Sequence, residues 1–259
     1  MTKLLFRTSW RNYGPFLLLL LFILGLWETL ARIDVLPPFI LPGPLSIGTA
    51  LVENRKLLFG LHLPATLQEV LLGYALSVTC GTLLGLGMHM WRPLEKALYP
   101  FVIISQTIPL IALSPVFIMW FGYTLWSKVA VVFLTAFFPV VVGTYDGLQQ
   151  KIPAYEDLLR TMGASTRQIL LKTRIPLALP SFFSGLKLSM VYCVIGATIG
   201  EWLGGSKGLG YFSRRMAGNL QSKEMFAAVV LLSAMGVGLF LVIAMIEKII
   251  FKKRGFHNK

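Results

Sequence analysis

Residues 152–180 form a polar and basic segment in an otherwise apolar chain, with the sequence IPAYEDLLRTMGASTRQILLKTRIPLALP. Pro153 suits the first turn of a helix, because the N–H that proline lacks would be unpaired there in any case. The apolar residues that follow have the i, i+3, i+4, i+7 spacing of one helical face: Tyr155, Leu158, Leu159 and Met162. Gly163 is then expected to end the helix, since glycine tolerates the left-handed conformation that closes it.

A second short helix is expected after this glycine. Ser165 and Gln168 have the spacing of a capping box, which starts a helix at Ser165. Pro176 disfavours helical geometry in the residue before it, so this helix is expected to end near Arg174. The segment therefore predicts a pair of short helices that face water and suit the docking of a partner protein. Its charged side chains are Glu156, Asp157, Arg160, Arg167, Lys172 and Arg174.

The rest of the chain has the composition of an integral membrane protein. Of its 259 residues, 56% are hydrophobic and only 14% are charged, and the apolar residues come in runs of about 20, the length that crosses a bilayer as a helix. We predict an all-α membrane protein, with one transmembrane domain over residues 1–259 that contains six transmembrane helices. The predicted spans are about 16–31, 64–90, 97–120, 125–147, 179–203 and 225–250, with a cytoplasmic docking segment at 152–176.

The distribution of basic residues predicts the orientation of these spans. Of the 24 Lys and Arg, fourteen fall in segments that are cytoplasmic if both termini are cytoplasmic, and eight fall in the opposite segments. This excess follows the positive-inside rule, so the net charge of +13 does not indicate nucleic-acid binding. The first apolar run is interpreted as a retained span and not as a signal peptide, because no small-residue cleavage pattern follows it.

The sequence offers no catalytic or metal-binding constellation. Cys80 and Cys193 both fall inside apolar runs, where we expect them to be small packing residues without a disulfide. The three histidines are scattered at positions 62, 89 and 257, and the glycine-rich stretch at 204–210 lacks the Gly-Lys-Ser/Thr order of a nucleotide-binding loop. We therefore predict neither enzymatic activity nor a metal site.

Polar residues and prolines interrupt the third predicted span. Pro109 and Pro115 lie six residues apart, beside Gln106, Thr107 and Ser114. Proline frees a backbone carbonyl, and a freed backbone group at membrane depth needs protein or a water-filled cavity beside it. A helix that lines a translocation path and a kinked packing helix both fit this pattern. As candidates for the path we take Gln106, Thr107, Pro109, Ser114 and, from the fifth span, Glu201.

Two spans carry a small residue at every fourth position, a pattern that permits close helix contact. The positions are Gly73, Ser77, Gly81 and Gly85 in the second span, and Gly185, Ser189, Cys193 and Ala197 in the fifth. Glu201 continues the second line, which places its carboxylate on the close-packed face. Lys187 points to nearly the opposite side, where an interface anchor and a contact with the path both remain open. Glu69 is expected at the membrane interface.

The docking segment resembles the cytoplasmic signature loop of the permease subunits of binding-protein-dependent ABC importers. That loop has Glu-Ala-Ala, three residues, Gly, nine residues, Ile, one residue and Leu-Pro. When the sequences are aligned on Gly163, the family's Glu falls on Asp157, its alanines on 158 and 159, its Ile on Thr173 and its Pro on Pro176. The resemblance extends over roughly residues 60–250. The stretches IPLIALSPVFIMWFGY and EWLGGSKGLGYF look like the branch that serves nitrate, sulfonates, taurine and thiamine-precursor pyrimidines, with a weak preference for the last.

The resemblance implies a type I ABC importer permease in the bacterial cytoplasmic membrane, with partners that the chain does not contain. These are a second permease copy as a homodimer, two cytosolic ATPase subunits that hold ATP and Mg, an extracytoplasmic solute-binding protein and membrane lipid. The chain itself would bind no cofactor. The residues implied in ATPase coupling are Glu156, Asp157, Arg160, Gly163, Ala164, Ser165 and Pro176.

A carrier driven by an ion gradient is the alternative interpretation. Such a protein would also have kinked spans, and coupling to protons would use an intramembrane acid such as Glu69, Asp146 or Glu201. The two hypotheses differ in their partners. A carrier works alone, whereas an importer permease needs an ATPase on the docking segment and alternates between states that ATP favours or disfavours.

Overall fold

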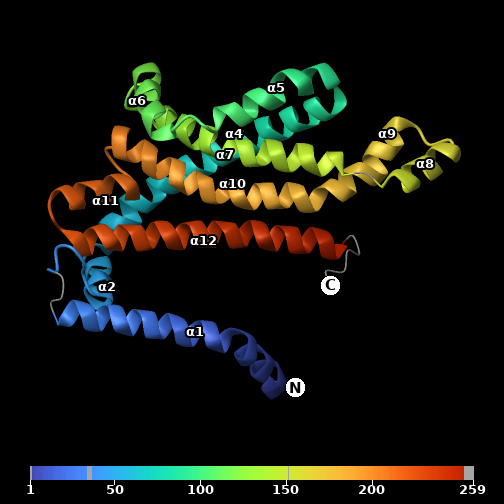
Figure 1. The fold of residues 1–259 in the computed structure, drawn as a ribbon. Helices are drawn as coiled ribbons and strands as arrows, with labels where there is room; N and C mark the ends of the chain where they lie inside the picture. The colour runs from blue at the N-terminus through green and yellow to red at the C-terminus, as the bar shows by residue number, and fades with distance from the viewer. Residues whose placement is uncertain (1, 34–36, 151, 254–259) are drawn as a thin grey trace.

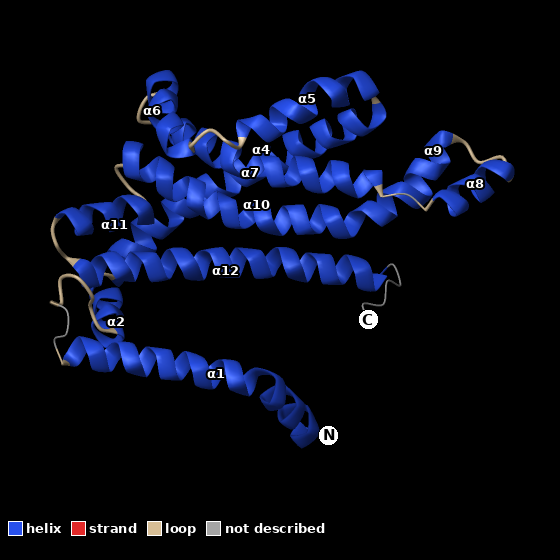
Figure 2. Ribbon diagram, viewed as in Figure 1, coloured by secondary structure: helices blue, strands red, loops and turns tan. Residues whose placement is uncertain are grey.

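The computed structural model describes residues 2–33, 37–150 and 152–253, and every regular element in these ranges is helical (Figures 1 and 2). Five helical rods are long and apolar enough to cross a membrane. These rods contain α1 (Thr2–Arg32), α4 (Leu63–Met90), α7 (Leu125–Gln149), α10 (Ile175–Gly204) and α12 (Ser222–Lys253). The prediction of an all-α membrane protein is thus confirmed.

Shorter helices flank the long ones. At one end lie α2 (Pro44–Glu53), α3 (Arg55–Leu57), the π-helical turn η1 (Leu58–His62) and α11 (Leu209–Gly218). At the other end lie α8 (Pro153–Thr161), α9 (Thr166–Ile169) and the π-helical turn η2 (Leu170–Arg174). Figure 1 shows the free ends of α1 and α12 on the same side of the molecule as α8 and α9.

The prediction that the second docking helix stops before Pro176 is wrong. Helical structure continues from α9 through η2 into α10, so that 166–204 is one rod, and Ile175 has φ −61° and ψ −47°. Pro176 lies in the first turn of α10, directly after the wider π-helical turn η2. The proline would otherwise break the backbone hydrogen bonds of a continuous α-helix at this point. The docking segment is therefore rigidly continuous with a long apolar helix.

The range 97–120 is not one straight span. It consists of α5 (Arg92–Ser105) and α6 (Leu110–Phe121), which meet at an angle of 103°. The break falls at residues 106–109, where Pro109 has an extended backbone and precedes α6. Proline cannot donate to the helical ladder, so the chain turns here. The pair counts as a sixth span only if both arms together cross the membrane.

Helix α7 lies at the centre of the bundle, between α4 and α10 (Figure 1). Of its most apolar stretch, 56% is buried inside the chain, against 6% for α1. The predicted small-residue faces make these contacts. A Cβ atom added to Gly81 would lie 2.9 Å from the Cβ of Val140. A Cβ atom added to Gly143 would lie 2.9 Å from the Cα of Gly185. Small residues thus let three backbones approach closely.

Hydrogen bonds between helices reinforce this contact. The hydroxyl of Ser77 on α4 donates to the carbonyl of Phe133 at 3.0 Å, and that of Ser189 on α10 donates to the carbonyl of Ala136 at 2.8 Å. Both acceptors are on α7. Because no water competes for these groups inside a bilayer, such bonds are expected to contribute about 0.6–2 kcal/mol each.

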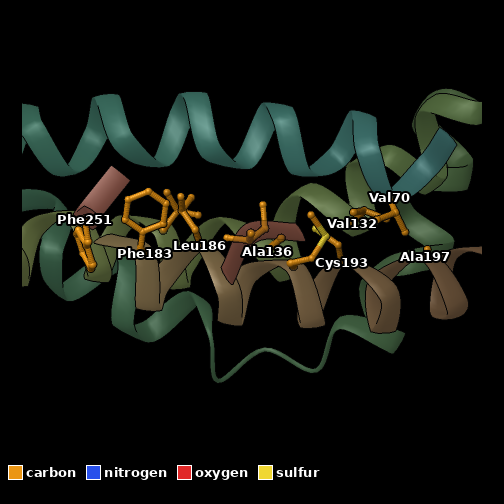
Figure 3. Close-up of a cluster of buried hydrophobic side chains, with 11 residues drawn as sticks. Val70, Val132, Ala136, Phe183, Leu186, Cys193, Ala197 and Phe251 are labelled. Carbon is orange, nitrogen blue, oxygen red and sulfur yellow. The ribbon is translucent and has the colours of Figure 1, made fainter. Parts of the chain in front are cut away.

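Apolar side chains fill the remaining space between α4, α7, α10 and α12. Figure 3 shows Val70, Val132, Phe183 and Phe251 among the side chains of this core. Cys193 is completely buried in it, as expected for a small packing residue. Cys80 is exposed on α4, so the same expectation is wrong for Cys80. Neither cysteine is in a disulfide.

A hydrogen bond to a carboxylate and an ion pair attach peripheral helices to their neighbours. Glu28 on α1 accepts from the Arg32 side chain at 2.8 Å and from the backbone N–H of Leu45 on α2 at 3.1 Å. Lys187 on α10 lies 2.7 Å from Glu247 on α12, and both side chains are largely buried. Sequence analysis left the role of Lys187 open between an interface anchor and a contact with the path. The structure gives it a third role, as the partner of an acid on α12.

We predict that Gly185→Ala destabilises the bundle. The added methyl would lie 3.2 Å from the Cα of Gly143 and closer still to the carbonyl oxygen of Pro139, both of them backbone atoms that cannot move without displacing α7. Overpacking of this kind costs about 1–3 kcal/mol. Thermal unfolding in detergent should show a lower midpoint. The control is Gly238→Ala on α12, where nothing lies within 4 Å of the new methyl. Equal midpoints for the two variants would contradict the packing account.

Candidate functional site

The docking segment projects from one end of the bundle (Figure 1). Helix α8 begins at Pro153, as predicted. Of its predicted apolar face, Tyr155, Leu158 and Met162 are 49%, 54% and 75% exposed. Three large apolar side chains on this short helix and directly after it remain uncovered by the rest of the chain, although burying them would be favourable. The face is therefore suited to a partner surface.

The turn between the two short helices has the predicted geometry. Gly163 has φ +82°, and its N–H donates to the carbonyl of Arg160 at 2.9 Å. No atom lies within 4 Å of the place where a Cβ would be, so glycine is needed here for its backbone conformation and not for space. Ser165 and Gln168 form both bonds of the capping box.

One arginine ties the docking segment to two long helices. Arg174, in η2, forms a bidentate ion pair with Glu156 on α8, with distances of 2.9 Å from Nε to Oε1 and 2.8 Å from Nη2 to Oε2. Its Nη1 lies 3.1 Å from Nε2 of His89 at the end of α4. The Glu156 carboxylate is buried. The Arg174 guanidinium therefore links α8 directly to α4 and to the rod that continues as α10.

The other candidate coupling residues differ in exposure. Asp157, Arg160 and Ser165 are exposed, whereas Ala164 and Pro176 are half-buried. Asp157 and the buried Glu156 are adjacent in sequence but face different surroundings. Of these two acids, only Asp157 is available to a partner protein.

A second group of hydrogen-bonded side chains lies at the opposite end, where α11 begins. Each of the first backbone N–H groups at this end donates to a side chain from another element. Gly208 donates to Nδ1 of His62 at 3.0 Å, and Leu209 donates to the hydroxyl of Thr66 at 2.8 Å. Gly210 and Tyr211 donate to Oε2 of Glu201 at 2.5 Å and 3.2 Å. The unpaired N–H groups of a helix start are thus fully satisfied.

Glu201 is the centre of this arrangement and is completely buried. Its Oε1 accepts from the hydroxyl of Thr66 at 2.6 Å, which links α10 to α4. Gly208 has φ +116°, and a Cβ there would overlap the Glu201 carboxylate. The predicted placement of Glu201 on the close-packed face is confirmed. Its carboxylate holds the glycine-rich stretch against α4 and α10.

Glu69 and Lys128 lie in the same buried region. The Lys128 ammonium is 3.3 Å from Oε1 of Glu69, and both side chains are almost entirely inaccessible to solvent. Glu69 also lies next to Glu201. Glu69, expected at the membrane interface, is buried between helices and pairs with a lysine of α7. We call His62, Thr66, Glu69, Lys128 and Glu201 the polar cluster.

The structure does not bring the remaining path candidates together with Glu201 in a pocket. Gln106, Thr107 and Pro109 are exposed at the break between α5 and α6. Ser114 is buried, and its hydroxyl has no hydrogen-bond partner among the described residues. Those residues also contain no cluster of three or more His, Cys, Asp or Glu that could hold a metal ion.

Sequence reasoning missed the pairings that organise both ends. His62 and His89 were considered only as isolated histidines, yet each contacts a segment distant in sequence. Lys128 was considered only in the count of basic residues, and Arg174 only in that count and as a charged residue at the end of the docking segment. One signal was available: an ionisable residue within an apolar run requires a partner, which could have prompted a search for the acid opposite Lys128.

Comparison with known proteins agrees with this architecture. A formylaminopyrimidine transport permease protein of Halalkalibacterium halodurans is 45% identical over 248 residues, which cover 96% of this chain and 98% of that protein. A putative aliphatic sulfonates transport permease protein of Bacillus subtilis is 29% identical, with 85% and 80% covered. The solved structure of an amino acid ABC transporter superposes with a TM-score of 0.60 at 18% identity, over 79% of this chain and 97% of that one, and so supports the fold.

Residues 77–255 match the family described as "binding-protein-dependent transport system inner membrane component". This match covers well over half of the chain and includes the docking segment, α7, α10, α11 and all of α12. None of the comparisons supports the alternative of an ion-gradient carrier. The chain belongs to this family and is a multi-pass permease subunit of a binding-protein-dependent ABC importer.

Proposed function

We propose that two copies of this chain form the transmembrane path of an ATP-driven importer for a small pyrimidine related to formylaminopyrimidine. The observation that carries this proposal is the 45% identity, over nearly the full length of both chains, to a permease named for that compound. The sulfonate permease is much less similar, at 29%. An extracytoplasmic solute-binding protein would deliver the pyrimidine and supply most of the selectivity.

ATP and Mg would bind to two cytosolic ATPase subunits, one on each docking segment, and not to this chain. The exposed apolar face of α8 and the exposed Asp157, Arg160 and Ser165 support this assignment. With the docking segment in the cytoplasm, both termini are also cytoplasmic, in agreement with the excess of basic residues in these segments.

The ion pair between Arg174 and Glu156 would carry the movement of the ATPase into the membrane. Closure of the ATPase subunits on ATP displaces α8, and the guanidinium passes this displacement to α4 at His89 and directly into α10. The turn at Gly163 and the capping box keep α8 and α9 as one unit. ATP shifts the permease between two states because only one of them fits the closed ATPase pair.

The polar cluster would act at the outer end of the path. Glu201 and its partners fix the start of α11, which follows the glycine-rich stretch. Movement of α10 during transport therefore acts on α11 through the Glu201 carboxylate. We assign this cluster to the outer gate or to contact with the binding protein. Gln106, Thr107, Pro109 and Ser114 remain path candidates, and the break between α5 and α6 would open toward the second copy.

Uptake of labelled formylaminopyrimidine tests the proposed substrate. Cells that express the chain with its ATPase and binding protein should accumulate the compound, and a sulfonate or nitrate should not compete. Uptake should stop when the ATPase is inactivated and persist when the proton gradient is collapsed with ATP maintained. Competition by a sulfonate alone would refute the substrate class, whereas dependence on the proton gradient would refute ATP-driven transport.

Glu156→Gln and Asp157→Asn should separate the internal from the external role of two adjacent acids. Glu156→Gln leaves the Arg174 guanidinium without its carboxylate, and breaking a buried pair costs about 3–5 kcal/mol. We expect a lower unfolding midpoint for the isolated permease and fewer molecules transported per ATP. Asp157→Asn, with the same change in charge, should leave that midpoint unchanged and weaken ATPase binding instead. The assignment is wrong if both variants behave alike.

Glu201→Gln should impair transport at the opposite end. The carboxylate accepts three hydrogen bonds, and each bond to a charged acceptor contributes about 1.5–3 kcal/mol. We expect reduced uptake, with ATPase binding retained. Glu53→Gln is the control, because Glu53 lies at the same end in an exposed pair with Lys223. Normal uptake and normal binding-protein affinity in Glu201→Gln would exclude a role for the cluster in gating.

A further inference from the structure

A cavity of about 520 Å³ lies between the docking segment and the end of α4. Arg174 closes it from η2, Arg160 contributes from α8 and Arg167 from α9. The rest of the lining consists of His89, Met90, Thr166, Ile169, Leu170 and Leu171. We call it the basic cavity. The proposed transport mechanism uses Arg174 and His89 for coupling and Arg160 for ATPase docking, but it assigns no ligand to the cavity itself.

The charge of the basic cavity is not balanced from within. Three guanidinium groups line it and no carboxylate does. Arg174 is neutralised by Glu156, but neither Arg160 nor Arg167 has a carboxylate within 4 Å among the described residues. Both are exposed. Guanidinium groups bind the oxygens of phosphate through paired N–H donors, so two free ones beside a single cavity fit one phosphate group.

The remaining wall of the basic cavity is apolar and lies at the end of the membrane-spanning part of α4. Met90 is the last residue of that helix and is 73% exposed, and Leu171 is 53% exposed. Trp91, the next residue, is 61% exposed, and tryptophan is typical of the membrane interface. A ligand in this place would meet basic groups on one side and apolar surface on the other. A free inorganic anion has no part that matches the apolar wall.

We propose that the basic cavity binds an anionic phospholipid, with its phosphate between Arg160 and Arg167 and the start of an acyl chain along Met90 and Leu171. Basic pockets between membrane helices bind anionic headgroups in this manner. The proposal requires only that α4 ends at the membrane surface, so it does not depend on the identity of the transported solute. A bound lipid would link α4 to α9 beside the ion pair between Arg174 and Glu156.

Tyr155 and Met162, from the apolar face assigned to the ATPase, do not line the basic cavity, and of the exposed polar residues assigned to the ATPase only Arg160 does. Met162, Gly163 and Ala164 line a separate hollow, together with Tyr155 and Lys172. Lys172, like Arg167, is an exposed basic residue. It is five positions further along the same rod and does not line the basic cavity. Arg167 and Lys172 therefore provide a matched comparison. Substitution of either residue removes one positive charge, from opposite sides of the docking segment.

Native mass spectrometry of the intact permease–ATPase complex, titrated with phosphatidylglycerol or phosphatidylcholine, tests the proposal. We expect preferential binding of phosphatidylglycerol. Arg167→Gln should weaken this binding about fivefold, the effect of one basic group near a membrane surface. Lys172→Gln should bind as the wild type does. Glycerol phosphate, which has the headgroup chemistry without acyl chains, should not compete at the same concentration.

Four results would overturn the assignment. Equal affinity for both phospholipids would mean that the cavity does not recognise anionic headgroups. Equal losses in Arg167→Gln and Lys172→Gln would mean attraction by net charge alone. Full competition by glycerol phosphate would indicate a site for soluble anions. Binding to the isolated permease that disappears when the ATPase is added would indicate that an acidic surface of the partner protein occupies the cavity.

Discussion

Helices inside a bilayer gain no hydrophobic advantage from touching one another, so this bundle depends on how closely its backbones can approach. Helix α7 meets α4 and α10 through residues that are small or lack a side chain, and serine hydroxyls bridge the resulting contacts. This packing makes α7 the most buried of the long helices. The docking segment and the polar cluster lie at opposite ends of these tightly packed rods.

At each end of the bundle, a charged side chain links helices to one another. Arg174 joins α8 and α4 to the rod that continues as α10, and Glu201 joins α10 to α4 and α11. A buried charge is costly unless it is paired, so each of these groups fixes its partners in position. Helix α10 takes part in both linkages. It is therefore the element through which ATP closure at the docking segment would reach the polar cluster.

The sequence predicted the helices and the local turns well, because these depend on short-range rules. The turn at Gly163, the capping box at Ser165 and the small-residue faces of α4 and α10 all follow from residue spacing. The continuation of helix past Pro176 was not predicted, since it depends on a π-helical turn that has no clear sequence signal. The pairs formed by Lys128 and Lys187 join residues 59 and 60 positions apart, and only the packed structure brings them together.

The central claim is that a separate ATPase drives this permease from the docking segment. Purification of the tagged chain from native membranes in mild detergent, followed by mass spectrometry of the bound proteins and an ATPase assay, tests it directly. The account predicts an ATPase subunit in equal proportion to the permease and ATP hydrolysis in the purified sample. An oligomer of this chain that contains no ATPase, yet still transports after reconstitution into vesicles, would contradict it.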